Sequence, residues 1–385
     1  MSPYRVLFPL GLIAALLGAS AWISFGFNLT LDYPGRFHPD LMIGGFLASF
    51  ASGFLMTAIP KFTQTAHARL FEVIAACVAL VLVFMSSFLE SRIYVHLLSS
   101  AVFMLIAIFA AKRVRLRKTQ LPKFFLLVGL GIAMGIFGPI LLALNEFGIL
   151  PNALGQFGRL IFTQGAILAL MMGVGVKLLP ALMGWAPPPD EVNSSEIQDI
   201  QSKKYLAPAL VASVFTIGFA IEVAGHAQLG YLTRALAVSY IALAHWKIWR
   251  RPKSNGPHAF WLWLSTLSVS LGVWAPALWP AHAVDGLHLV FIAGFGLMIL
   301  MVATRVTLAH GGHGLDLEKK SKILSVVAWL LLLSTATRVI AIMMPKTYNH
   351  HLAYAALIWC VAILLWASVF LPKILKVKPT SFTKD

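Results

Sequence analysis

The sequence predicts an all-α polytopic membrane protein, with about twelve transmembrane helices in one bundle, arranged as two sets of six joined by a polar linker. Hydrophobic residues make up 59% of its 385 residues and charged residues 11%, whereas an ordinary soluble protein has about 25% charged residues. Apolar runs of about twenty residues, long enough to cross a bilayer at about 1.5 Å per residue, recur along the chain. One membrane bundle is therefore expected, and not several soluble domains.

The first six-helix half covers residues 1–184, with spans expected at 7–27, 40–60, 70–89, 93–111, 124–144 and 159–183. The second half covers residues 205–372, with spans expected at 205–224, 227–249, 259–279, 287–309, 323–344 and 350–372. Residues 373–385 follow as a basic tail. The first apolar run is too long for a typical signal-peptide core and lacks a convincing cleavage site, so we expect it to be retained.

The polar linker, residues 185–204, reads WAPPPDEVNSSEIQDIQSKK and has no apolar period. Its Pro, Ser and acidic residues predict a segment that lies in water between the two halves. Two halves of six spans hint at an internal duplication, as in transporters, but no motif recurs at corresponding positions of the halves.

The net charge of +16 comes from basic residues in loops on one side of a twelve-span arrangement. The loops on the other side carry Asp32, Glu90, Glu146 and Asp285 with few lysines. The positive-inside rule then places the linker and both termini in the cytoplasm. Because membrane orientation accounts for the charge, a nucleic-acid partner is not expected.

Two glycine-rich spans each begin with a histidine. The first stretch, residues 36–64, reads RFHPDLMIGGFLASFASGFLMTAIPKFTQ, with His38 at its mouth and Met42 one turn further in. Its small residues would let neighbouring helices approach closely, so this span is expected at the centre of the bundle. The second stretch, residues 285–314, reads DGLHLVFIAGFGLMILMVATRVTLAHGGHG and begins with His288. A histidine beside a membrane span is a candidate functional residue, although interfacial histidines are also common.

These two stretches resemble the two signature regions of the NnrS family, multi-span bacterial membrane proteins associated with haem, copper and the response to nitric oxide. The family's first signature is a His-x-His-Glu-Met run before Gly-Phe, with a later Gly-Phe-Leu-Leu-Thr-Ala-x-Pro. Residues 37–42 (FHPDLM) and 53–60 (GFLMTAIP) occupy these places. Only the first histidine is kept, because Asp40 replaces the second and Leu41 replaces the glutamate. The second signature is intact as His288, Thr304, Arg305, His310 and Gly312.

The resemblance implies a haem protein of the bacterial inner membrane, acting in nitric oxide or nitrosative-stress metabolism or in a denitrification-linked response. It implies one haem b held by His38 and His288, which come from two helices and lie on the same side of the membrane. The alternative is that each of these histidines lies at the membrane interface and is hydrogen-bonded to a loop. Asp285, one turn before His288, is expected either to hold the imidazole Nδ1–H or only to cap the helix, and Met42 is expected beside the haem.

The resemblance also associates copper with the family. His310 and His313, three residues apart in a Gly turn, are candidates for a copper or zinc site, the alternative being a solvated loop. His288 and His310 are 22 residues apart on one helix, roughly 33 Å, so they cannot share a metal ion. Arg305 is expected to pair with a haem propionate or a phospholipid, or to snorkel.

The expected partners are nitric oxide or another small diatomic ligand and membrane lipids; the sequence identifies no redox partner and leaves open whether the protein is an enzyme. The two cysteines, Cys77 and Cys360, lie inside spans and form no Cys-x-x-Cys-His motif, so any haem is non-covalent. The rival hypothesis is a secondary transporter that uses intramembrane charges as substrate or proton sites: Glu72, Arg159, Lys177, Glu222, Arg234 and Arg338.

Overall fold

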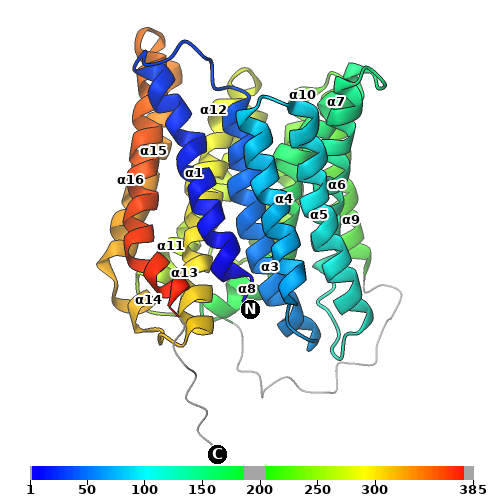
Figure 1. Cartoon of the computed structure of the whole chain (residues 1–385), viewed down its shortest axis with the longest axis vertical. Helices are drawn as coiled ribbons and strands as arrows, with labels where there is room; N and C mark the ends of the chain where they lie inside the picture. The colour runs from blue at the N-terminus through cyan, green and yellow to red at the C-terminus, as the bar shows by residue number, and fades with distance from the viewer. Residues whose placement is uncertain (1, 186–204, 377–385) are drawn as a thin grey trace, which may run out of the picture.

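The computed structural model describes residues 2–185 and 205–376, which form a bundle of long helices running between two ends (Figure 1). Within these residues no β-strand occurs, and eleven helices are long and apolar enough to cross a membrane. The all-α polytopic membrane fold is therefore confirmed. These spans are Tyr4–Gly26, Phe37–Thr63, Leu70–Phe88, Arg92–Arg115, Phe125–Glu146, Asn152–Leu182, Leu206–Val223, Pro257–Leu278, Pro280–Gly311, Lys322–Met343 and Pro345–Leu375.

A further helix, α10 (Ala227–Ala244), completes the expected number of about twelve. It lies between α9 (Leu206–Val223) and α11 (Pro257–Leu278) and packs on both. Gln228 and Arg234 reduce its apolar character. The predicted linker beyond Trp185 and residues 377–385 of the predicted tail lie outside the described residues.

The two ends of the bundle are distinguished by the chain termini at one end and by three short helices at the other. The N-terminus and the end of α16 (Tyr348–Leu375) lie at the same end, which we call the lower end, as an even number of crossings requires (Figure 1). The opposite, upper end is where the second, sixth and tenth spans begin. These spans start with the short helices α2 (Phe37–Pro39), α7 (Asn152–Leu160) and α12 (Ala283–His288).

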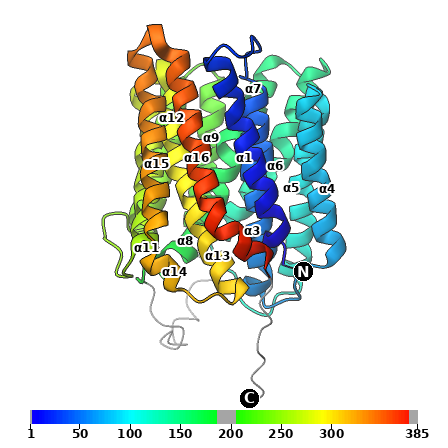
Figure 2. The same ribbon diagram turned by 60° about the vertical axis from the view of Figure 1, so that its left-hand side comes forward.

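The spans pack in three sets of four. The sets begin with α1 (Tyr4–Gly26), α6 (Phe125–Glu146) and α11, and consecutive spans pack on each other within each set. The second span of each set also packs on the fourth: α3 (Ala48–Thr63) on α5 (Arg92–Arg115), α8 (Ile167–Leu182) on α10, and α13 (Leu297–Gly311) on α16. The sets join through three pairs of helices: α5 and α6, α10 and α11, and α16 and α1. Of these, α16 and α1 lie side by side in both views (Figures 1 and 2). Nine spans thus close into a ring around the other three, which are the second span of each set. The remaining spans are α4 (Leu70–Phe88) and α15 (Lys322–Ile340), the third of the first and last sets.

Each of these three inner spans contains a π-helical segment directly after its short first helix. The segments are η1 (Asp40–Leu47), η2 (Ile161–Ala166) and η7 (Leu289–Gly296). π-Helical turns are rare and are found mostly at functional sites. Glycines lie in these segments where neighbouring helices are closest: a Cβ at Gly45 would come within 2.8 Å of Ala14, and one at Gly294 within 2.7 Å of Val269.

The repeat of four spans is visible in the sequence as a short matching motif, which a comparison of the two six-span halves does not find. Ile43-Gly44-Gly45-Phe46 in η1 corresponds to Ile292-Ala293-Gly294-Phe295 in η7, eight spans later. The repeating unit in the described residues is four spans long. A comparison of halves of six spans therefore aligns helices that do not correspond to one another.

Candidate functional site

His38 lies at the upper end of the second span, where its ring is tied to another helix. Nδ1 of His38 is 2.9 Å from the carbonyl oxygen of Gly18 in α1. A carbonyl only accepts hydrogen bonds, so Nδ1 carries the proton and Nε2 keeps its lone pair. Gly18 permits this approach, because a Cβ there would lie 3.1 Å from both the Cβ of Leu41 and the sulfur of Met42.

His288 has the same tautomer at the upper end of the tenth span. It is the last residue of α12, and its Nδ1 donates to the carbonyl oxygen of Val284, 2.7 Å away and one turn earlier. Across the described residues, no hydrogen bond is formed by Nε2 of His38 or of His288. Two imidazoles at the same end of the bundle therefore each present a free nitrogen lone pair, the form in which histidine binds metals.

The two histidines are electrostatic neighbours. The charge of Arg338 in α15 acts on both rings, and His38 acts on His288. Both are half-buried, and an aromatic ring packs edge-on against each: Trp22 at 6.0 Å from His38 and Phe291 at 5.9 Å from His288, measured between ring centroids. Lower down, α3 packs on α13, whereas η1 packs on α1 and α4, and η7 on α11 and α15. The two spans thus meet below the histidines and have different neighbours at their level.

Asp285 takes a role that the sequence analysis did not anticipate. Its Oδ1 accepts hydrogen bonds from Arg338 Nη1 at 2.5 Å and from Tyr348 Oη at 3.0 Å. The carbonyl of Val284, and not Asp285, holds the Nδ1–H of His288. Both members of the Asp285–Arg338 pair are buried, which places a neutralised ion pair beside the two histidines.

A polar cavity of about 580 Å³ lies at the upper end above this ion pair. Asp285 and Tyr348 form part of its wall, together with His282, Lys346, Asn349 and His350. Cationic and hydrogen-bonding side chains therefore border the candidate site on the side away from the bundle centre.

The family model described as NnrS protein matches residues 1–378, nearly the whole chain. The chain belongs to the NnrS family. None of the curated proteins matches it. Family membership and the membrane helices together make it a membrane protein linked to the nitric oxide response.

The NnrS signature residues divide between the two ends of the bundle. His38, Met42 and His288 lie at the upper end, where Met42 packs against Gly18. Asp40, which stands where the family has its second histidine, has Arg92 as its charged neighbour. Arg92 in turn forms an ion pair with Glu146 at 2.6 Å.

Arg305 of the second NnrS signature lies towards the lower end, 17 residues after His288, or about 25 Å along the helix. Its Nη2 donates to Glu318 Oε1 at 2.6 Å. Glu318 belongs to the short helix α14 (Asp316–Lys320) and is 2% exposed. Burial raises the pKa of the Glu318 carboxyl, and the charge of Arg305 opposes this rise. The structure therefore does not bring Arg305 together with His38 and His288.

The signature histidine His310 and its neighbour His313 are also at the lower end, and their rings contact different residues. The ring of His310 packs edge-on against Tyr4, with 6.0 Å between centroids, and His67 is its electrostatic neighbour. Nε2 of His313 is 3.0 Å from the carbonyl oxygen of Lys373. Gly312, with φ of +66°, reverses the chain between them. No group of three or more His, Cys, Asp or Glu side chains placed to hold a metal ion occurs in residues 2–185 and 205–376.

Two further polar groups lie inside the bundle. His96 of α5 is 6% exposed, and neither ring nitrogen has a hydrogen-bond partner in the described part of the chain; the same holds for the hydroxyl of Ser99. Nothing in the sequence distinguishes His96 from the other upper-end histidines, because only packing shows its burial. Arg234 pairs with Glu222 at 2.5 Å and stacks on the rings of Phe219 and Tyr231.

Proposed function

We propose that His38 and His288 hold one haem b near the upper end of the bundle, and that this member of the NnrS family binds or processes nitric oxide there. The observation that carries the proposal is the matched state of the two imidazoles. Each donates Nδ1–H to a backbone carbonyl and leaves Nε2 free, and they come from two different inner spans. Haem iron with two protein ligands needs imidazoles with this division of roles.

The surroundings of the two histidines fit the rest of a haem. Trp22 and Phe291 supply aromatic surface beside the rings. Lys346 and Asn349, which line the polar cavity at the same end, supply cationic and hydrogen-bonding partners for propionates. The bound group would supply an iron able to change oxidation state and, once one of the two imidazoles has left it, to bind a diatomic ligand. The chain's own part is to fix the tautomer of His38 through Gly18 and that of His288 through Val284.

The proposed location is the bacterial inner membrane, with the lower end in the cytoplasm. Lys112, Arg113 and Arg115 end α5 at the lower end, and Lys319 and Lys320 end α14 there. Basic residues of this kind remain on the cytoplasmic side of bacterial membrane proteins.

The transporter hypothesis has less support, because most of the intramembrane charges on which it rests are paired. Glu222 binds Arg234, Arg338 binds Asp285, and Glu72 at the lower end binds Arg113 at 2.9 Å. Buried pairs of this kind neutralise charge that a solute or proton site would need to expose.

The test is the optical spectrum of the purified full-length protein and of three variants. The parent is expected to show a Soret band and a b-type pyridine haemochrome. His38→Ala and His288→Ala are expected to lose the haem or to leave it five-coordinate, because a methyl group donates nothing to iron. His226→Ala, which removes an exposed histidine at the same end, is the matched control and is expected to keep the parent spectrum. A colourless parent protein that accumulates a solute in vesicles would replace the proposal with the transporter hypothesis.

A further inference from the structure

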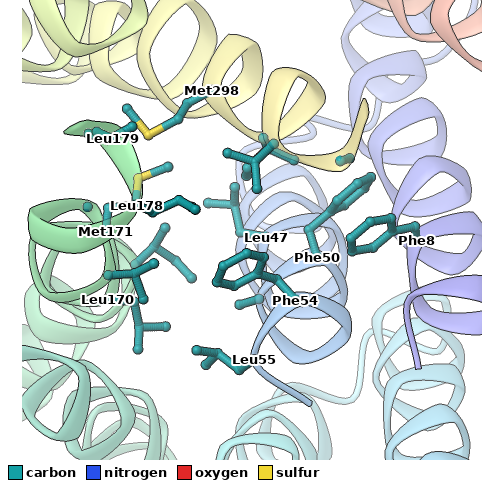
Figure 3. A pocket seen from close by; sticks show the side chains of 17 residues that line it. Phe8, Leu47, Phe50, Phe54, Leu55, Leu170, Met171, Leu178, Leu179 and Met298 are labelled. Atoms are coloured by element: carbon teal, nitrogen blue, oxygen red, sulfur yellow. The ribbon is translucent and has the colours of Figure 1, made fainter. Parts of the chain in front are cut away.

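An apolar, partly open cavity of about 100 Å³ lies between the three inner spans (Figure 3). Its lining residues on the second and tenth spans begin with Leu47 and Met298, so it lies below the level of His38 and His288. Its walls come from α3, α8 and α13, with Phe8 of α1 closing one side. It therefore occupies the centre of the ring formed by the three sets of four spans.

Every side chain that lines the cavity is apolar, and none offers a hydrogen bond. On α3 the wall includes Ala51 and Phe54, on α8 it includes Met171, and on α13 it includes Val302. These four residues remain partly accessible although they belong to the innermost spans. An apolar cavity of this size stays dry, because a water molecule needs polar partners to replace those it leaves.

The size of the cavity and its apolar lining together determine which molecules can bind in it. Ions and polar solutes are excluded by the missing partners, and a cavity of about 100 Å³ is too small for a quinone or a drug-sized ligand, whose pockets have about 300 Å³ or more. A small apolar gas molecule needs no hydrogen bond and fits the space. Engineered dry cavities of comparable volume, about 150 Å³, bind xenon.

We propose that this central cavity is a docking site for nitric oxide on its way to the upper-end histidines. This inference rests on the proposed function, because it assigns the molecule delivered to that site. A row of aromatic side chains leads upward from the cavity wall. Phe50 lines the cavity and packs edge-on against Phe46 at 5.3 Å, and Phe46 packs edge-on against Trp359 at 5.6 Å. Trp359 contacts Gly296, which ends η7 in the span that begins beside His288. Aromatic side chains thus link the cavity to η1 and η7, the segments that follow His38 and His288 in the two spans.

The first measurement uses xenon as the probe and needs no haem. Crystals of the full chain under xenon pressure are expected to show an anomalous peak between α3, α8 and α13. Ala51→Leu fills the cavity from α3 and is expected to lose the peak, and Val302→Phe fills it from α13 and is the second variant if the first does not fold. Ala58→Leu is the matched control: it lies two turns further along α3, is similarly exposed, and does not line the cavity. No xenon in the parent, or an acyl chain in the cavity, would overturn the proposal.

The second measurement is the rate of nitric oxide association with the haem-loaded protein after laser photolysis. Ala51→Leu is expected to slow association several-fold with an unchanged Soret band, and Ala58→Leu is expected to match the parent. An unchanged rate in a cavity-filled variant that has lost its xenon peak would show that nitric oxide does not use this site. If the purified protein carries no haem, the proposed function fails on that ground, while the xenon map still decides whether the cavity takes an apolar gas.

Discussion

His38 and Gly18 join two helices through one hydrogen bond, from the imidazole Nδ1 to the carbonyl oxygen, at 2.9 Å. The bond crosses from the second span to the first, so the orientation of His38 depends on how closely these spans approach. The absence of a side chain at Gly18 sets that distance, because a Cβ there would press on Leu41 and Met42. His288 is held only by a carbonyl of its own helix. The two imidazoles therefore differ in how firmly their positions are fixed.

The first prediction is that Gly18→Val weakens haem binding without touching a ligand. The new side chain pushes α1 away from Leu41 and Met42 and lengthens the bond that holds His38. Loss of one hydrogen bond costs about 1 kcal/mol, or roughly fivefold in haem affinity. Haem titration of the apoprotein measures this change. Gly129→Val is the control, because a Cβ at Gly129 meets nothing within 4 Å. Equal haem affinities for both variants would show that Gly18 does not position His38.

The sequence was sufficient for the approximate number, the order and the approximate ends of the spans, because these depend on the length of apolar runs. It was sufficient to place His38 and His288 at the same end of the bundle, since both stand at the mouths of glycine-rich spans, whereas their joint binding of a haem stays a prediction. It was not sufficient for the partners of the charged residues. Asp285 meets Arg338 and Arg305 meets Glu318 through contacts between helices distant in sequence, and α14, which carries Glu318, is too short and polar to give a periodic signal.

The central cavity could not be predicted for a related reason. Its lining residues are ordinary apolar side chains of transmembrane spans, and only their arrangement leaves space between them. The repeat of four spans is visible in the sequence at Ile43–Phe46 and Ile292–Phe295, but only once the correct repeat length is known.

The second prediction concerns the ion pair between Arg338 and Asp285. Arg338→Leu leaves the buried Asp285 carboxylate with the Tyr348 hydroxyl and with His282 Nδ1, 3.7 Å away, as its remaining partners. Breaking a buried pair in this way costs about 3 to 5 kcal/mol of stability. Replacing both residues by leucine is expected to recover most of this loss, because no unpaired charge remains. Thermal unfolding in detergent of the two single variants and the double variant measures the coupling. Additive losses would mean that the two charges do not stabilise one another.

The third prediction concerns Glu318 and pH. Burial raises the pKa of Glu318 above its usual 4.5, so the folded protein binds this proton more tightly than the unfolded chain does. The resulting stability is fully present below about pH 4.5 and is lost as the pH rises through the folded pKa. Glu318→Gln is expected to remove this part of the pH dependence of the unfolding temperature. Asp316→Asn, an exposed residue of the same short helix, is the control and is expected to follow the parent. A parent and a Glu318→Gln protein with parallel pH profiles would contradict the assignment.

The fourth prediction is that the lower end faces the cytoplasm. The described lower end carries the basic ends of α5 and α14, and the positive-inside rule assigns such residues to the cytoplasm. Reporter fusions after Trp185 and after Asp385 are expected to score cytoplasmic, and a fusion in the loop around Glu90 is expected to score periplasmic. The opposite pattern would invert the bundle and place His38 and His288 at the cytoplasmic surface.

The last prediction separates the lower-end histidines from the haem and from each other. His310→Ala and His313→Ala are both expected to keep the parent's haem content, because His310 is roughly 33 Å from His288 along one helix. If copper is bound at this end, His310→Ala is expected to lower the copper content, since His310 lies beside Tyr4 and has His67 as a neighbour. His313→Ala is expected to leave copper unchanged and to cost about 1 kcal/mol of stability, because its Nε2 is engaged by the carbonyl of Lys373. Metal analysis and the haemochrome assay on the same preparations measure both quantities. A folded His310→Ala protein without haem would show that the two ends form one centre.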